Sequence, residues 1–214
     1  MDNFIKAITY IPAGMLVTIE YSLISIFFGF ILGSFLSLCK VGTFKSLRLF
    51  ANCYTSIFRG TPLLVQLYFV YFAIPSLLHI EISAFVAGII AFSLNSAAYI
   101  SENISAGIMS VDKGQFEAAK SLGMPYKIMM RYIILPQAIR NILPSLVNEA
   151  INMTKESAII SVIGEADIMR RAYIVSAEQY NFSEPLLIAA ICYYIIVMSL
   201  SLIAKILEKR LRKI

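Results

Sequence analysis

The stretch PAGMLVTIEYSLISIFFGFILGSFLSL, Pro12–Leu38, is apolar along almost its whole length and decides the class of fold. A helix of roughly 20 mostly apolar residues is long enough to cross a lipid bilayer. A secretory signal peptide has a shorter apolar core that ends at a small-residue cleavage site, and this stretch has neither property. We therefore interpret Pro12–Leu38 as a first membrane-spanning helix.

Four further apolar stretches follow, and the sequence as a whole predicts an all-α integral membrane protein of about five spans. Hydrophobic residues make up 59% of the chain and charged residues only 14%, whereas a soluble domain carries about 25% charge. The second span contains Arg59-Gly60-Thr61-Pro62, where proline is expected to break or kink the helix. We expect one membrane domain over residues 1–214, with the later spans at about 53–78, 83–109, 142–163 and 185–207.

Lysine and arginine are unevenly distributed between these spans. Cytoplasmic loops of membrane proteins carry an excess of both residues. In the loop after the fourth span they are offset by acidic residues. Elsewhere they gather in the first loop (Lys40, Lys45, Arg48), the third loop (Lys113, Lys120, Lys127, Arg131, Arg140) and the tail (Lys205, Lys209, Arg210, Arg212, Lys213). This pattern predicts an outside N-terminus and a cytoplasmic C-terminus, as an odd number of spans requires. Because basic residues gather at cytoplasmic helix ends in membrane proteins, the net charge of +5 gives no reason to expect a nucleic-acid partner.

The third loop, residues 110–141, is longer than a simple connection needs and is helix-prone. Gln115–Leu122 predicts a short helix, Gly123 a C-cap turn with positive φ, and Pro125 the start of a second helix. Pro136 is expected to end or bend that second helix. From these residues alone the loop is either a docking element or a passive amphipathic linker on the lipid surface. A DNA-binding helix-turn-helix is a poor fit, because no third helix completes a core.

Two of the predicted spans each carry a polar stripe. Charge in hydrocarbon costs roughly 2.5–3.5 kcal/mol per residue on insertion scales, so such stripes face protein or a water-filled cavity. At about 100° per residue, one stripe lies within about 100° of arc and the other within about 120°. The first consists of Asn95, Tyr99, Glu102 and Asn103, and the second of Ser145, Asn148, Glu149, Asn152, Lys155 and Glu156.

Two interpretations of these stripes compete. In the first, Glu102 and Glu156 bind the ammonium group of a solute, and the neutral polar residues Asn95, Tyr99, Asn152 and Ser157 hydrogen-bond it. In the second, an internal ion pair joins helices or subunits, for example Lys155 with Glu149 or Glu156.

Several classes of function find no support in the residues. Cys39, Cys53 and Cys192 show no paired spacing and His79 is the single histidine, so no metal site or cofactor is indicated. No Gly-x-x-x-x-Gly-Lys-Ser/Thr loop is present for ATP, and no set of nucleophile, base and acid suggests an enzyme. An ion-coupled secondary carrier or channel, active without an ATPase, remains an alternative.

The third loop resembles the loop signature of membrane subunits of bacterial ABC importers. That signature matches Glu117-Ala118-Ala119, Gly123, Ile133 and Leu135-Pro136 in order and spacing. Further segments are similar to the polar amino-acid branch, the histidine/glutamine/arginine permeases. They are 59–66 (RGTPLLVQ), 97–99 (AAY), 110–115 (SVDKGQ), 135–138 (LPQA) and 161–164 (SVIG), and together the similarity extends from about residue 12 to residue 207.

The resemblance implies a transport subunit of the bacterial cytoplasmic (inner) membrane that passes a polar amino acid by alternating access. Its partners would be two copies of an ABC ATPase that hold ATP and Mg²⁺, a second permease subunit (itself or a paralogue), and a soluble amino-acid-binding protein. The residues implied in ATPase coupling are Glu117, Ala118, Ala119, Gly123 and Pro136. Acidic positions equivalent to Glu102 and Glu156 can contact the amino acid in such proteins. Many relatives carry a basic residue where this chain has Ser105, and that residue can bind the carboxylate of the amino acid.

Overall fold

The computed structural model describes residues 2–211, and every regular element in that range is a helix. Arg212 and Lys213, two of the predicted tail cations, lie outside these residues. The elements in order are α1 Asp2–Tyr10, α2 Gly14–Val41, α3 Lys45–Gly60, α4 Leu63–Tyr68, the π-helical η1 Phe69–Ala73, α5 Ile74–Leu78, α6 Ala84–Met109, α7 Lys113–Ser121, α8 Tyr126–Met129, the π-helical η2 Met130–Ile134, α9 Leu135–Glu156, the 3₁₀-helical η3 Ser157–Ile163, α10 Ile168–Gln179 and α11 Ser183–Leu211.

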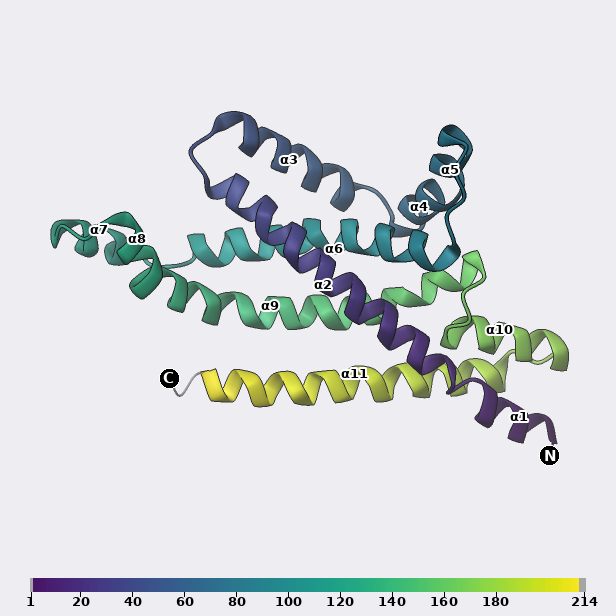
Figure 1. Cartoon of the computed structure of the whole chain (residues 1–214). Helices are drawn as coiled ribbons and strands as arrows, with labels where there is room; N and C mark the ends of the chain where they lie inside the picture. The colour runs from purple at the N-terminus through teal and green to yellow at the C-terminus, as the bar shows by residue number, and fades with distance from the viewer. Residues whose placement is uncertain (1, 212–214) are drawn as a thin grey trace.

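Long helices run roughly along one axis, with short helices at both ends (Figure 1). The helices α6, α9 and α11 extend in this direction, and α2 crosses them obliquely. The most extensive contact between any two elements is that of α2 with α6. At one end lie α7, α8 and the end of α11, and at the other lie α1 and α10 (Figure 1).

Three helical segments of the described chain are long and apolar enough to cross a membrane: Phe4–Val41, Ala84–Met109 and Ser183–Ile206. The bent pair Lys45–Gly60 and Leu63–Leu78, with an angle of 104°, becomes a fourth if it is counted as one span. The prediction of an all-helical chain with apolar spans is confirmed at this level. The predicted fourth span at 142–163 corresponds to α9 and η3, and it is not among these segments.

The predicted break at Arg59-Gly60-Thr61-Pro62 is confirmed, because α3 ends at Gly60 and α4 begins at Leu63. Two further prolines follow π-helical turns. Ahead of Pro136, the Leu135 N–H bonds the carbonyl of Met130, and ahead of Pro75 the Ile74 N–H bonds the carbonyl of Phe69. A proline has no N–H to donate to the carbonyl four residues earlier, and its ring crowds that carbonyl. The chain therefore stays helical through Pro136 and continues as α9, with a widened turn before the proline.

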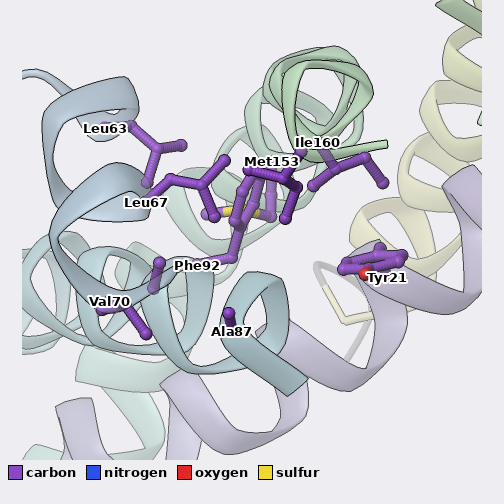
Figure 2. Packing of buried hydrophobic residues seen from close by; sticks show 10 residues of the cluster. Tyr21, Leu63, Leu67, Val70, Ala87, Phe92, Met153 and Ile160 are labelled. Carbon is purple, nitrogen blue, oxygen red and sulfur yellow. The ribbon is translucent and has the colours of Figure 1, made fainter. Parts of the chain in front are cut away.

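The largest apolar cluster joins the broken segment to the long helices. Figure 2 shows Leu67, Phe92 and Met153 directed toward one another from α4, α6 and α9, with Ile160 of η3 beside them. Leu67, Phe92 and Ile160 are fully buried. Between apolar helices in a bilayer, close van der Waals packing takes the place of the hydrophobic effect, so the short helix α4 is held by packing.

The contact between α2 and α6 is close because small residues line it. A Cβ added at Gly33 would lie 2.8 Å from the carbonyl oxygen of Ala97 and 2.9 Å from the side chain of Ile100. Small residues let helix backbones approach closely in this way inside membranes. This close contact fixes the register of α2 on α6, and the register brings the last turn of α2 beside Glu102.

Candidate functional site

The carboxylate of Glu102 on α6 is bound by two cations from two other helices. Lys40 Nζ in the last turn of α2 lies 2.6 Å from Glu102 Oε1, and Arg59 Nη1 in the last turn of α3 lies 3.2 Å from the same oxygen. The Lys40 side chain is 8% exposed and also donates to Thr55 Oγ1 at 3.0 Å. Glu102 is 38% exposed. We call Lys40, Arg59 and Glu102 the charge cluster.

Tyr99 lies one turn before Glu102 on α6, and its ring contacts the guanidinium of Arg59. The guanidinium carbon of Arg59 is 5.5 Å from the centre of the Tyr99 ring. Such a cation–π contact contributes about 0.5–1 kcal/mol at an exposed site. Of the sequence-predicted solute residues, Tyr99 and Glu102 are thus brought together, and Arg59 joins them.

Asn95, another predicted solute residue, is buried and committed to the break between α3 and α4. Its Nδ2 donates to Gln66 Oε1 at 3.0 Å and to the carbonyl of Phe58 at 3.3 Å. Gln66 Nε2 in turn donates to the carbonyls of Phe58 at 2.8 Å and Thr61 at 3.0 Å. The two amides therefore satisfy carbonyls that the break leaves open. Sequence reasoning missed Gln66, although an amide side chain four residues after a helix-breaking proline was an available signal.

The predicted residues on α9 and η3 form a second, separate group. Asn152 and Glu156 are exposed, whereas Ser157 is buried and donates to the carbonyl of Thr154 at 2.8 Å. No hydrogen bond or ion pair in the described part of the chain links them to the charge cluster. The alternative of an internal ion pair at Lys155 is likewise not seen among the described side chains, since Lys155 pairs with neither Glu149 nor Glu156. Glu149 is only 7% exposed.

A cavity of about 460 Å³ adjoins the charge cluster. Lys40 and Glu102 form part of its wall, and Arg48 and Asn52 of α3 form another part. Ser105 also lines it, and its hydroxyl donates to Ser37 Oγ at 3.2 Å. The ionic groups of the wall are therefore two cations and one carboxylate.

The segment between α6 and α9 contains the predicted short helix, α7. Asp112 caps its start by accepting from the Gly114 N–H. After its end, Gly123 has φ +68°, which confirms the predicted left-handed turn, and the Met124 N–H bonds the carbonyl of Ala119 at 3.1 Å. Pro125 precedes α8, as expected for a second helix.

The two faces of α7 differ. Ala119 is buried against an apolar cluster that includes Ile108, Met129 and Ile134. Glu117, Ala118 and Gly123 are exposed, and so is Pro136 at the start of α9. The helix is therefore fixed to its own chain through one side and presents the other side outward.

Apolar helices of spanning length define an integral membrane protein, and an ion cluster that joins three helices is typical of membrane transport proteins. The chain belongs to the family described as "Binding-protein-dependent transport system inner membrane component", which it matches over residues 10–213.

Individual relatives are similar over nearly their whole length. A putative glutamine transport system permease protein, GlnP, of Rickettsia conorii is 60% identical over 98% of this chain and 96% of the relative. The arginine transport system permease protein ArtQ of Bacillus subtilis is 51% identical over 97% of this chain and 95% of the relative.

Solved structures agree with this assignment. A chain of the "Crystal structure of an amino acid ABC transporter with histidines" superimposes with a TM-score of 0.91 at 43% identity, over 96% of both chains. An inward-facing MetNI methionine ABC transporter has a TM-score of 0.77 at 18% identity, over 94% of this chain and 96% of the other, which indicates a shared fold.

The family decides between an ABC permease subunit and a self-sufficient carrier or channel. The chain is a multi-pass permease subunit of the inner membrane, of the polar amino-acid ABC transporter type. Its family implies an ATPase and a binding protein as partners, and ATP hydrolysis is not an activity of this subunit. A self-sufficient carrier or channel has no such partners, so that alternative is dropped.

Proposed function

We propose that this subunit carries a polar amino acid inward by alternating access, with glutamine and arginine as the first candidates. The observation that carries the proposal is the identity of 60% and 51% to permeases named for these two amino acids, over nearly the whole chain. The working complex would contain two ATPase subunits holding ATP and Mg²⁺, a second permease (itself or a paralogue), and a soluble amino-acid-binding protein. Residues 1–214 would act as one domain.

For the topology we propose five spans, with the N-terminus outside and the C-terminus in the cytoplasm. The bent pair α3 and α4–α5 counts as one span in this scheme, and α9 as another. Support comes from Figure 1, where the basic loop with α7 and α8 lies at the same end as the end of α11. The excess of lysine and arginine in these segments favours the cytoplasm for that end. A polar α9 is acceptable in a membrane where neighbouring helices cover it.

We propose that α7 is a coupling helix that docks on the ATPase. Glu117 and Ala118 would face the ATPase, Ala119 would anchor the helix to its own chain, and Gly123 would set the angle of the following turn. Pro136 would begin the helix that transmits the motion. The exposed and buried sides of α7 described above support this division. A helix anchored in this way moves as a rigid body when its partner moves.

For the solute path we propose two walls. One holds Asn95, Tyr99 and Glu102, and the other holds Asn152, Glu156 and Ser157. Tyr99, Glu102, Asn152 and Glu156 are at least partly exposed and can contact a solute, whereas Asn95 and Ser157 are buried and would shape the wall. An exposed carboxylate at Glu156 suits an ammonium group.

Reconstitution tests the proposal. Proteoliposomes that contain this subunit with its ATPase should accumulate radiolabelled L-glutamine or L-arginine only when ATP and the binding protein are both supplied. The subunit without the ATPase should accumulate neither amino acid. Uptake driven by a sodium or proton gradient in the absence of the ATPase would contradict the assignment.

A further inference from the structure

We infer that the charge cluster binds the carboxylate of the amino acid, with Arg59 as the donor and Glu102 as a positioning residue. The inference rests on the proposed function and deepens it. The observation behind it is a simple imbalance of charge, since two cations, Lys40 and Arg59, share the single carboxylate of Glu102.

The sequence suggested that Glu102 binds the ammonium group of a solute, but one oxygen of Glu102 already binds the ammonium group of Lys40. Lys40 Nζ is 2.6 Å from Glu102 Oε1, and Thr55 Oγ1 accepts a second hydrogen bond from the same ammonium. Because Lys40 is almost fully buried, a solute ammonium that took this oxygen, Oε1, would leave the lysine charge without its carboxylate partner. Leaving a buried charge without its partner is strongly destabilising. A solute ammonium at this oxygen is therefore disfavoured.

Arg59 has spare capacity for an anion. A guanidinium carries five N–H donors, and one of its nitrogens, Nη1, lies against Glu102. The side chain is 45% exposed, so its remaining edge is accessible. The ring of Tyr99 lies against the guanidinium, and arginine can make a planar, two-bond contact with a carboxylate.

The position of Arg59 is fixed by the break that follows it. Arg59 is the penultimate residue of α3, and the carbonyl just before it, that of Phe58, accepts hydrogen bonds from both Gln66 and Asn95. The end of α3 is thus tied to α4 and α6 by buried amides. A donor held in this way loses little freedom on binding, which favours affinity.

The neighbouring cavity has the same excess of positive charge. The wall of the cavity contains two cations, Lys40 and Arg48, and one carboxylate, Glu102. Its volume of about 460 Å³ lies within the range of about 300–1,000 Å³ that small-molecule pockets occupy. Arg59 is not part of the cavity wall and meets it only through Glu102, the carboxylate that it binds.

The decisive experiment compares amino acids with the amines that lack only the carboxylate. The probes are radiolabelled L-arginine with agmatine, and L-glutamine with 4-aminobutanamide. They are bound to the purified permease–ATPase complex without binding protein. The wild-type complex should bind at least one amino acid about 10-fold or more tightly than its amine. Arg59→Gln should lower the affinity for the amino acid by a similar factor and leave the affinity for the amine unchanged.

Two further variants complete the design. Arg59→Lys keeps the charge without the planar fork, so we expect an intermediate loss for the amino acid, and this variant decides the matter if Arg59→Gln does not assemble. Arg131→Gln is the matched control, because Arg131 also stacks on a tyrosine, with its guanidinium carbon 5.7 Å from the ring centre of Tyr132, but lies outside the cluster. It should bind both probes like wild type.

The outcomes separate this inference from the proposed function. Equal affinity of wild type for an amino acid and its amine overturns the role of Arg59, and so does an equal loss for both probes in Arg59→Gln or Arg59→Lys. A wild-type complex that neither binds nor accumulates an amino acid contradicts the proposed function itself.

Discussion

Lys40 and Glu102 lie 62 residues apart in the chain, yet the ammonium of the first donates to the carboxylate of the second across 2.6 Å. The pair joins the end of α2 to α6, and Lys40 is much the more buried partner. Its contribution to stability therefore depends mainly on keeping the lysine charge paired. An exposed pair of the same length would contribute little.

A double-mutant cycle tests this dependence. Glu102→Gln leaves the Lys40 ammonium buried beside a hydroxyl, so we expect the larger fall in the apparent melting temperature of the detergent-purified complex. Lys40→Met, which leaves Glu102 paired with Arg59, should lower it less. The double variant should be more stable than the sum of the two losses predicts, with a coupling energy of about 0.5–3 kcal/mol. Strictly additive losses would show that the two groups are not coupled.

The buried amide of Asn95 gives a second prediction. Asn95→Ala removes a donor to Gln66 Oε1 and to the Phe58 carbonyl, and leaving a buried acceptor unpaired costs about 1–3 kcal/mol. We expect a lower apparent melting temperature. Asn52→Ala on the exposed side of α3 is the control, with little change in stability. If Asn95→Ala kept the wild-type melting temperature but weakened amino-acid binding, Asn95 would be a direct solute contact.

Close packing of α2 on α6 gives a third prediction. Gly33→Ala places a methyl group 2.8 Å from the Ala97 carbonyl oxygen, a backbone atom that cannot move away alone. Overpacking of this kind costs about 1–3 kcal/mol. Gly60→Ala is the matched control, because no atom lies within 4 Å of the added group. A thermal-shift assay on both variants measures the difference, and equal melting temperatures would mean that α2 can slide on α6.

Much of the helical architecture was predictable because apolar length is a strong local signal. The first, third and last spans predicted at 12–38, 83–109 and 185–207 correspond closely to α2, α6 and α11. The break before Leu63 and the positive φ of Gly123 also followed from local chemistry. The fourth span predicted at 142–163 lies within a helix that begins earlier, at Leu135, in the segment where the sequence predicted a second helix of the third loop.

The site was less predictable because it depends on contacts between distant segments. Lys40 was assigned to the first loop because the predicted span ended at Leu38. It belongs to the last turn of α2, and only the register of α2 on α6 directs it to Glu102. Arg59 was treated as part of a sequence motif, and no ion-pair partner was predicted for it. The N-cap role of Asp167 before α10 was also missed, although Ile168, Ala172 and Val175 follow the i, i+4, i+7 spacing of a helix.

Asp167 leads to a prediction about pH. Its buried carboxylate accepts from the Arg170 N–H at 2.8 Å and from the Tyr193 hydroxyl at 3.0 Å. Burial raises the pKa of this carboxyl above its ordinary value, and these hydrogen bonds only partly oppose the rise. The folded state therefore binds the proton more strongly than the unfolded state. The stabilisation is complete below the unfolded pKa and is lost as pH rises through the folded pKa.

Asp167→Asn removes this titration while it keeps the size of the side chain and an oxygen for the Arg170 N–H. As the pH rises from about 4 to about 7, we expect the melting temperature of wild type to fall more than that of the variant. Melting curves of both proteins across that range measure the difference. Parallel pH profiles would show that Asp167 does not titrate differently on folding.

The turn after α7 gives the last prediction, which concerns coupling to the ATPase. Gly123 has φ +68°, and no atom lies within 4 Å of a Cβ added there. A substitution is therefore strained by the backbone alone, by roughly 1–2 kcal/mol for most residues and least for Asn and Asp. Gly123→Val should keep membrane insertion but shift the docking angle of α7. Binding-protein-stimulated ATPase activity should fall strongly, and pull-down of the ATPase should weaken.

Three comparisons make this result specific. Gly123→Asn tolerates the left-handed turn and should retain most of the stimulation. Glu117→Lys changes the charge on the exposed side of α7 without strain, and it should uncouple ATP hydrolysis as Gly123→Val does. Lys45→Ala, at the start of α3, should stimulate like wild type. If Gly123→Val and Glu117→Lys complexes assembled and stimulated normally, α7 would be a passive connector. The ATPase would then have to act on the bundle through another surface.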